Sequence, residues 1–330
     1  MDNIREVAKL AGVSVPTAYK VFSKAYDTSE KTKRKVLEAA RQLDYISKNE
    51  KKQREENIVG IVVGSIENSF FNGLIDSLLK EFGRYQYNTI VLYCNGNPEQ
   101  LKYNLELLGH IGAKAIIFEP MTQERHDIVY HLKTKGIVLL QLFTTVYPEI
   151  DTLKFDDELG TYTAVKELLK CGHTNIAMFY KKWDICPERE PGYEKAFMEM
   201  GIPIRRDNLC KMDYTKNIGS ILKDKICSLC PTAILSVNET MTINILQVLD
   251  ELKLSVPDDI SLIVYDDLPW MQALNLTAIS HPFDKIGESA SEMILNKLRD
   301  KTDSSEAAVL EINPILISRG STKILDSFIK

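Results

Sequence analysis

Four side chains near the start of a short helical segment have the types and placement that suit contact with nucleic acid. The segment runs from about Val15 to Phe22 and follows a tight turn at Gly12. Its outward-facing residues near the N-terminal end are Val15, Pro16, Tyr19 and Lys20. In a helix-turn-helix, this end of the second helix reaches base edges in the major groove of DNA. The chemistry predicted for the segment is therefore recognition of double-stranded DNA.

Two further helices must hold that segment in place. A first helix from about Ile4 to Ala11 is expected because its apolar residues recur at i, i+3, i+4 and i+7, and Gly12 ends it. Ser14 is a suitable N-cap for the second helix. The residues with the spacing to pack these two helices together are Ala8, Val13, Ala18 and Val21. The pattern is typical of a helix-turn-helix.

A third helix is expected from about Glu30 to Leu43, with Ser29 as its N-cap. Its predicted apolar stripe consists of Val36, Leu37, Ala40 and Leu43. Amphipathic helices of this kind could also form a purely structural bundle. The N-terminal position, the basic charge and the polar segment that follows favour a DNA-binding head instead.

Charge is unevenly distributed along the chain of 330 residues, whose net charge is −5. Residues 1–56 hold thirteen Lys and Arg against nine Asp and Glu, a net charge of +4, and the remaining residues hold 28 against 37, a net charge of −9. A small basic head on an acidic body predicts that the head alone meets a polyanion. Residues 47–57 contain no hydrophobic side chain, which marks a linker between the two.

Beyond the linker, short apolar runs alternate with helical stretches such as Phe70–Arg84 and Glu239–Leu252. The expected strands are Ile58–Ile66, Thr89–Cys94, Ala115–Glu119, Ile137–Leu142, Ile176–Tyr180, Ala233–Val237 and Leu262–Tyr265. This rhythm is typical of doubly wound parallel sheets. About 270 residues are too many for one such sheet, so we expect an α/β body of two similar lobes with a cleft between them.

Motifs along nearly the whole chain carry a family resemblance. In the head they are Ile-Arg-Glu-Val-Ala-Lys-Leu-Ala-Gly-Val-Ser-Val from Ile4 to Val15 and the run from Ser29 to Ala40. In the body they are Asn68-Ser69-Phe70-Phe71, Cys171-Gly172-His173, Arg189-Glu190-Pro191-Gly192-Tyr193, Asn238, Tyr265-Asp266-Asp267 and Ile279-Ser280-His281-Pro282. Together these segments closely resemble the LacI/GalR family of bacterial repressors, which usually has Asn-Pro-Phe-Phe where this chain has Ser69.

The resemblance implies a helix-turn-helix head at residues 1–46, a polar hinge at 47–57 and an effector-binding, dimerising body at 58–330. The body would be two-lobed and similar to periplasmic binding proteins. Its N-lobe is expected at about 58–157 and 283–300, and its C-lobe at about 158–282 and 301–330. The implied function is that of a regulator, in the family a repressor, which binds a pseudo-palindromic DNA operator as a homodimer and responds to a small molecule between the lobes.

The resemblance also implies roles for residues of the head. Val15, Pro16 and Tyr19 occupy positions that touch bases, and Lys20 a position usually held by an Arg that contacts a base or a phosphate. Ser14, Thr17 and Thr32 occupy phosphate-contacting positions, which suit hydroxyl groups and helix N-termini. Tyr19 replaces a usual Ser. Because Lys lacks the planar fork of Arg, we expect an operator that departs from the family consensus.

The hinge departs from the family more strongly. Members generally carry a hinge helix that begins near a Pro-Asn pair and includes a leucine that wedges into the minor groove. This chain has Ser47-Lys48 where members have the Pro-Asn pair, and Arg54 at about the position of the leucine. Two interpretations stay open: a loose tether, or a polar hinge that contacts phosphates through Lys48, Lys51, Lys52 and Arg54.

In the family a ligand lies between the lobes, at the carboxyl ends of the strands. By position, the implied effector contacts are Asn68, Phe70, Arg189, Asn238, Asp266 and His281. Arg189 and Asp266 are the strongest candidates, because a guanidinium and a carboxylate can clamp hydroxyl or charged groups. Adjacent strand residues point to opposite faces, so only one of Asp266 and Asp267 can face the cleft. Two roles stay open for the nearby aromatic side chains, either walls of the cleft or ordinary core packing: Phe71, Tyr180, Trp183, Tyr214 and Trp270.

Departures at the cleft leave the ligand class open. Phe143 and Ser65 replace residues that are usually Asp in sugar-responsive members, and His281 replaces a common Gln. A sugar, a sugar phosphate and a nucleoside remain the candidate ligands. The cleft is nevertheless expected to offer fewer partners for hydroxyl groups than that of a typical member.

Other functional classes fit the sequence less well. GxGxxG, GxxxxGK[ST], GxSxG and HExxH are absent from the sequence, the histidines form no metal-ligand pattern, and the Cys227–Cys230 pair has no second ligand pair. We therefore expect no enzyme, metal or cofactor. The sequence contains no apolar run of membrane-spanning length and no recognisable export signal, which predicts a cytoplasmic protein without a membrane partner. The alternatives are a regulator controlled by a protein partner and a cytoplasmic small-molecule-binding protein.

Overall fold

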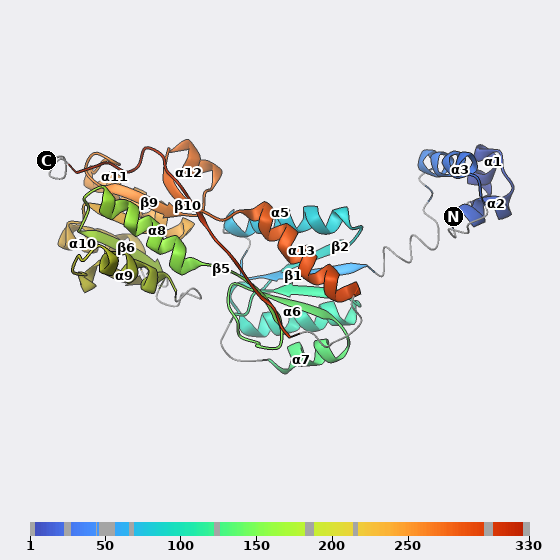
Figure 1. Ribbon diagram of the computed structural model, residues 1–330, viewed down its shortest axis with the longest axis horizontal. Helices are drawn as coiled ribbons and strands as arrows, with labels where there is room; N and C mark the ends of the chain where they lie inside the picture. The colour runs from blue at the N-terminus through green and yellow to red at the C-terminus, as the bar shows by residue number, and fades with distance from the viewer. Residues whose placement is uncertain are drawn as a thin grey trace.

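The computed structural model describes residues 4–22, 28–43, 45, 57–65, 69–121, 126–181, 188–213, 217–299 and 306–325. A head of three helices is followed by two lobes, each built on its own sheet (Figure 1). All of the predicted hinge except residue 57 lies outside the described residues, and so do the predicted phosphate contacts Lys48, Lys51, Lys52 and Arg54.

The head contains α1 (Ile4–Ala11), α2 (Val15–Phe22) and α3 (Glu30–Gln42). The predicted packing of α1 on α2 is confirmed, because the two helices share a core with α3 in which Ala8, Ala18 and Val21 are buried and Val13 is partly buried. The apolar stripe predicted for α3 is wrong at Leu37 and Leu43, which are exposed. The residues of α3 that are buried are Val36, Ala39 and Ala40.

Helix geometry explains that correction. Successive residues of a helix are rotated by about 100°, so positions three and four residues after Val36 return to the buried face, whereas the next residue does not. Ala39 and Ala40 occupy those positions. Leu43 is the C-cap of α3, beyond its last helical turn.

The first lobe is a six-stranded sheet in the order β11-β5-β4-β3-β1-β2, and all of its pairs are parallel. The strands are β1 (Ile58–Val63), β2 (Asn88–Tyr93), β3 (Ala115–Phe118), β4 (Val138–Leu142), β5 (Asp151–Phe155) and β11 (Val309–Ile312). The helices are α5 (Ser69–Arg84), α6 (Pro98–His110), α7 (Asp127–Thr134) and α13 (Phe283–Arg299). Val59, Ile61 and Val63 pack with α5 and α13, whereas Val62 packs with α6 and α7, as the alternation of side chains along a strand requires.

The second lobe repeats this design, with strand order β12-β10-β9-β8-β6-β7. Its strands are β6 (Ile176–Lys181), β7 (Leu209–Met212), β8 (Ala233–Ser236), β9 (Ser261–Tyr265), β10 (Thr277–Ser280) and β12 (Ile315–Ile317), and β12 alone runs antiparallel. Helices α8 (Asp157–Lys170) and α9 (Arg189–Glu199) pack on one face. The other face carries α10 (Ile218–Leu229), α11 (Glu239–Leu252) and α12 (Pro269–Ala273).

The predicted fold class is therefore correct: two doubly wound, mainly parallel sheets follow a helix-turn-helix head. The chain passes between the lobes after β5, after β10 and after β11. One predicted assignment differs, since β11 pairs with β5 in the first lobe although residues 301–330 were expected in the second. Five strands were not predicted: β5, β7, β10, β11 and β12. None of the helices in the described part of the chain is long and apolar enough to cross a membrane.

Candidate functional site

Hydroxyl groups cap two helices of the head. The Ser14 Oγ accepts a hydrogen bond of 3.2 Å from the Thr17 backbone N–H, and the two hydroxyls lie 2.7 Å apart. Ser29 repeats this arrangement at the start of α3, where its Oγ accepts from the Thr32 backbone N–H at 3.3 Å. Each cap satisfies one of the backbone N–H groups that have no acceptor within the helix. All three predicted phosphate-contacting hydroxyls of the head, those of Ser14, Thr17 and Thr32, thus lie at helix N-termini.

The second helix turns most of its predicted base-contacting side chains outward. Pro16 and Lys20 are exposed, and Tyr19 is 54% exposed. Val15 differs from the prediction, because it is half-buried and packs against the core of the head. A large aromatic side chain that is half exposed on a small domain contributes little to the core and is available for contacts outside it. The arrangement suits insertion of α2 into a groove of DNA.

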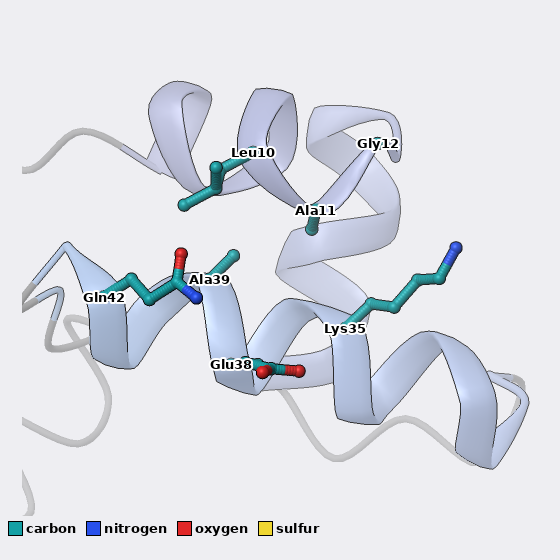
Figure 2. Close-up of a pocket in the computed structure, with 7 residues that line it drawn as sticks. All are labelled: Leu10, Ala11, Gly12, Lys35, Glu38, Ala39 and Gln42. Atoms are coloured by element: carbon teal, nitrogen blue, oxygen red, sulfur yellow. The ribbon is translucent and has the colours of Figure 1, made fainter.

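The head also has a shallow groove of about 400 Å³ between α1 and α3. Figure 2 shows its lining, with Lys35, Glu38, Ala39 and Gln42 of α3 facing α1 and the turn that follows it; the α1 side consists of Leu10, Ala11 and Gly12. No residue of α2 lines this groove. The groove and the outward face of α2 are therefore separate surfaces.

Between the lobes, aromatic rings gather around Phe70 in the first turn of α5. Its ring centroid lies 5.4 Å from those of Phe71 and Phe283, 5.7 Å from that of Phe143 and 5.5 Å from that of His281. These rings come from α5, from the end of β4, from the start of α13 and from the chain after β10. Such contacts provide a largely apolar surface with few groups that could bind a hydroxyl.

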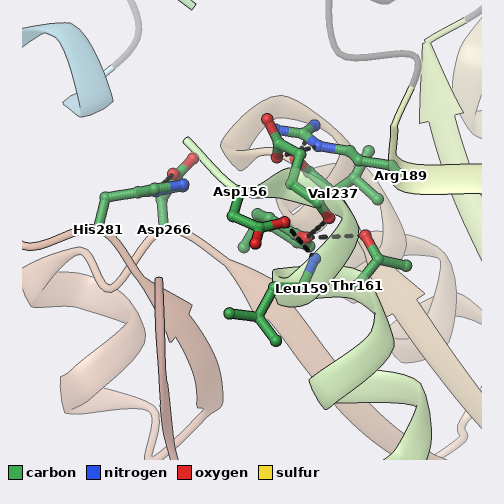
Figure 3. Close-up of polar contacts among 9 residues, drawn as sticks. Asp156, Leu159, Thr161, Arg189, Val237, Asp266 and His281 are labelled. Atoms are coloured by element: carbon green, nitrogen blue, oxygen red, sulfur yellow. Dashed lines mark hydrogen bonds and ion pairs between the residues drawn. The ribbon is translucent and has the colours of Figure 1, made fainter. Parts of the chain in front are cut away.

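His281 is the polar member of this cluster. Its Nδ1 lies 3.1 Å from the Asp266 Oδ1 (Figure 3). Its ring centroid lies 4.2 Å from that of Phe155. The Nε2 atom is buried and has no hydrogen-bond partner within the described residues. A buried polar atom without a partner is costly in a folded protein, so Nε2 is a candidate contact for a bound molecule.

Two residues at strand ends here have left-handed backbones. Phe143 follows β4 with φ of 69°, and Asp266 follows β9 with φ of 67°. Side chains other than glycine adopt this region at an energetic cost, and such residues concentrate at binding sites. Asp267 next to Asp266 turns away and pairs with Arg319 instead, at 2.8 Å. The two neighbouring carboxylates therefore have different partners, Asp266 with His281 and Asp267 with Arg319.

Arg189 is held within the second lobe. Its Nε donates to the Asp157 Oδ1 at 2.8 Å, and its Nη1 donates to the backbone oxygen of Val237 at 2.9 Å (Figure 3). The guanidinium also lies 4.5 Å from the centroid of the Tyr265 ring. Both members of the ion pair are nearly buried. Arg189 is therefore a structural residue of this lobe in addition to any contact with a ligand.

Gly192 lets Arg189 approach Asp157. A Cβ atom at this position of α9 would overlap the backbone oxygen of Glu158 in α8. Only glycine allows the starts of α8 and α9 to come this close, and Asp157 and Arg189 are the first residues of the two helices. The Arg-x-x-Gly spacing seen in the sequence thus has a packing reason.

A carboxylate that sequence reasoning did not single out links the two lobes. Glu239, the first residue of α11, accepts hydrogen bonds from the Ser69 backbone N–H and hydroxyl, each at 2.8 Å. It also accepts from the Trp270 Nε1 at 3.0 Å. The neighbouring Asn238 is the N-cap of α11 and accepts from the Met241 N–H. Glu239 follows the predicted contact Asn238 directly in the sequence. Its contact with the first lobe could not be predicted from local spacing, because Ser69 lies 170 residues earlier.

The structure brings five of the six predicted effector contacts into one continuous region. Phe70 contacts His281, which pairs with Asp266. The Tyr265 ring lies against both His281 and Arg189, and the chain continues from Val237, the partner of Arg189, to Asn238. Asn68 lies outside the described residues, as do Trp183 and Tyr214.

The aromatic residues that were considered as walls of the cleft lie in different places. Phe71 belongs to the ring cluster, and Trp270 contacts Glu239. Tyr180 instead donates to Glu190 at 2.9 Å, within the second lobe. Phe155 and Phe283 were missed in the sequence, Phe155 because the strand β5 that ends with it was not predicted.

Two buried titratable side chains outside the ring cluster, His173 and Cys94, are surrounded by other residues of the protein. His173 is fully buried between the Thr232 hydroxyl and the backbone oxygen of Lys323, and burial lowers the pKa of its imidazole below the usual 6.5. Burial raises the pKa of the Cys94 thiol, beside Glu119, to about 11. Such a thiol is a poor nucleophile. Among the described residues, no group of three His, Cys, Asp or Glu side chains is placed to hold a metal ion.

Comparison with known proteins supports this interpretation. Residues 56–318 match the family described as periplasmic binding proteins and sugar binding domain of LacI family, and residues 3–48 match the bacterial regulatory proteins of the lacI family. The HTH-type transcriptional repressor PurR of Vibrio cholerae serotype O1 (strain M66-2) is 28% identical over 338 residues, which cover 98% of this chain and 99% of the relative. PurR of Vibrio parahaemolyticus serotype O3:K6 is 27% identical over 337 residues, covering 99% and 100%.

Solved structures share the fold. The Lac repressor dimer bound to operator and the anti-inducer ONPF has a TM-score of 0.75 at 20% identity, over 97% of this chain and 99% of that one. A LacI family transcriptional regulator from Enterococcus faecium with bound ribose has a TM-score of 0.71 at 23% identity, over 82% and 100%. The chain belongs to the LacI family of bacterial regulatory proteins, as a DNA-binding transcriptional repressor with an effector-binding body.

Proposed function

We propose that this repressor binds a pseudo-palindromic operator as a homodimer, and that a small molecule bound between its lobes changes its affinity for that operator. The observation that carries the proposal is the outward placement of Pro16, Tyr19 and Lys20 on α2, over a head whose apolar residues form their own core. Exposed side chains on this face of α2 are accessible to DNA.

The proposed contacts divide by chemistry. Pro16 and Tyr19 contact base edges, and Lys20 contacts a base or a phosphate. Ser14, Thr17 and Thr32 contact phosphates from helix N-termini, where backbone N–H groups and the helix dipole favour an anion. Additional phosphate contacts are proposed for the hinge at Lys48, Lys51, Lys52 and Arg54.

The dimer proposal is supported by an apolar surface on the first lobe. Tyr103, Leu107 and Ile111 are exposed at intervals of four residues along α6 and its C-cap, and Tyr103 is 60% exposed. The exposed Tyr93 at the end of the edge strand β2 extends this surface, because its backbone oxygen accepts from Asn104 of α6 at 3.0 Å. A second copy of the chain would cover this surface and place two heads on two half-sites.

The effector is proposed to contact Phe70, Asn238, Asp266 and His281, with Arg189 and Asn68 as further partners. The Nε2 of His281 offers a buried hydrogen-bonding atom beside aromatic rings. Sugar, sugar phosphate and nucleoside remain the candidate classes. The pairing of Arg189 with Asp157 favours a ligand that needs fewer hydroxyl partners than a sugar does.

A second candidate function is control by a protein partner instead of a small molecule. The observation that favours it is that several polar groups of the interlobe region already pair with one another, as Arg189 does with Asp157 and Asp266 with His281. Titration of the purified protein with metabolite pools separates the two candidates. A ligand-induced change in operator affinity supports effector control, and no response to any pool supports a partner.

The proposed DNA recognition is tested by selecting bound sequences from a random DNA pool with the full-length protein at a stated salt concentration. A pseudo-palindrome with fixed half-site spacing is expected. Half-sites at variable spacing would mean that the heads read DNA but the linker does not fix them. Absence of any enrichment would overturn the proposed recognition by the unliganded protein.

A further inference from the structure

The Glu239 carboxylate receives hydrogen bonds from both lobes at once. From the first lobe, the Ser69 backbone N–H and hydroxyl donate to its two oxygens, each at 2.8 Å. From its own lobe, the Trp270 Nε1 donates at 3.0 Å. The Glu239 residue is only 8% exposed, so little water competes for these bonds. Hydrogen bonds to an ionised acceptor are stronger than those between neutral groups.

The placement of these groups explains why the contact is favourable. Ser69 is the first residue of α5, where backbone N–H groups have no acceptor within the helix and the helix dipole is positive. Glu239 is the first residue of α11, so its carboxylate lies between the starts of two helices from different lobes. Separating the lobes would return the Ser69 donors and the carboxylate to water.

Ser69 provides both donors through which the first lobe contacts Glu239. A proline at the same position, as in the Asn-Pro-Phe-Phe motif, has neither a backbone N–H nor a hydroxyl and could donate neither bond. The next residue, Phe70, contacts His281 and Phe143 in the ring cluster. The hydrogen bonds to Glu239 therefore lie directly beside the proposed effector contacts.

We propose that Ser69, Glu239 and Trp270 form a latch that holds the two lobes together at the starts of α5 and α11, here termed the closed arrangement, before any effector binds. The inference rests on the proposed function, because it assigns a mode of regulation to the same interlobe site. An effector that favours an open arrangement must break the latch, whereas one that favours the closed arrangement adds to it. The free energy of the latch thus sets the starting population on which the effector acts.

Trp270 provides a direct readout of the latch. The chain has two tryptophans, so a Trp183→Phe parent protein leaves Trp270 as the sole tryptophan. In this parent, Ser69→Pro removes both donors of the first lobe, and proline is well tolerated at the first position of a helix. The loss of these bonds is expected to lower the closed-to-open ratio about tenfold. Tryptophan emission should then shift to longer wavelength, acrylamide quenching should rise and small-angle scattering should show a larger radius of gyration.

Two further variants keep the test independent of that substitution. Ser69→Ala removes the hydroxyl donor alone and should give a smaller change in the same direction. Glu239→Gln places an amide N–H₂ group against donors and should resemble Ser69→Pro. The matched control is Glu99→Gln, which changes an exposed carboxylate in the first turn of α6 and should change none of the three signals.

Unchanged emission, quenching and scattering in both Ser69→Pro and Glu239→Gln, with the fold intact by circular dichroism, would overturn the latch. Operator binding is measured separately on the same samples. A parent protein that binds no operator would contradict the proposed function, while its fluorescence would still report on the latch.

Discussion

The head and the interlobe region differ in what their polar and aromatic side chains already contact. On α2, Tyr19 and Lys20 are exposed, and the core beneath them consists of other residues. Between the lobes, Arg189 pairs with Asp157, and Asp266 pairs with His281. The proposed recognition groups of the head are exposed, whereas several of the proposed effector contacts already pair with other residues of the fold.

This difference separates two kinds of mutational effect. Truncation of an exposed side chain on α2 should weaken operator binding and leave the stability of the head unchanged. Truncation of a paired side chain between the lobes should reduce stability, because its buried partner is left without compensation. A loss of ligand response in the second region therefore cannot be assigned to lost ligand contact until the free energy of unfolding has been measured.

The largest effect is expected for Arg189→Ala. Asp157 is nearly buried, and removal of its partner leaves a buried charge unpaired, which typically costs about 3–5 kcal/mol. We expect the free energy of unfolding of the body to fall by an amount of this order in urea titration. The control is Lys223→Ala, which breaks the exposed Lys223–Glu251 pair and should cost less than about 1 kcal/mol. Equal stabilities of the two variants would contradict the structural role of Arg189.

A smaller effect is expected for Leu107→Glu on α6. The side chain is exposed in the described chain, so the substitution should leave the free energy of unfolding of the body almost unchanged. If a second copy covers this surface, the buried charge should weaken dimerisation about tenfold or more in analytical ultracentrifugation. Met198→Glu on the exposed face of α9 serves as the control. Unaltered dimerisation in Leu107→Glu would show that the subunits associate through another surface.

The smallest effect is expected from the titration of His173. Because burial lowers the pKa of this imidazole in the folded protein, the unfolded chain takes up a proton at a higher pH, near 6.5. The contribution of His173 to stability is therefore complete above pH 6.5 and is lost as the pH falls below that value. The unfolding free energy of the body should decline less steeply on acidification in His173→Gln than in the unmodified chain. Parallel curves would mean that other groups cause the decline.

The head could be predicted closely from its sequence because its determinants are local. The bounds of α1 and α2 agree with the prediction, since Gly12, Ser14 and the apolar spacing all act within one or two helical turns. The prediction for Leu37 was wrong because α3 has two possible apolar faces, one with its leucines and one with Ala39 and Ala40. The face with the alanines is the one that packs in the core of the head.

The body could be predicted only in outline. Continuous apolar strands such as β1 and β8 stand out in the sequence, whereas β5 (Asp-Thr-Leu-Lys-Phe) and β7 (Leu-Cys-Lys-Met) contain charged residues. β11 joins the first lobe through pairing with β5, a partner more than 150 residues earlier, which no local pattern reveals. The Glu239–Ser69 contact spans 170 residues for the same reason. Local spacing therefore predicts the helices of the head well and the contacts between the lobes poorly.

The central claim, that exposed side chains of α2 read DNA, is tested most directly by competition binding of Tyr19→Ala to the selected operator. The expected result is a loss of about 1–3 kcal/mol, roughly 5- to 150-fold, in specific affinity, with an unchanged melting curve of the head. Leu10→Ala, which truncates a residue of α1 that is also about half exposed, should bind like the unmodified protein. Equal operator affinities of Tyr19→Ala and the unmodified protein, or an equal loss in Leu10→Ala, would contradict the account.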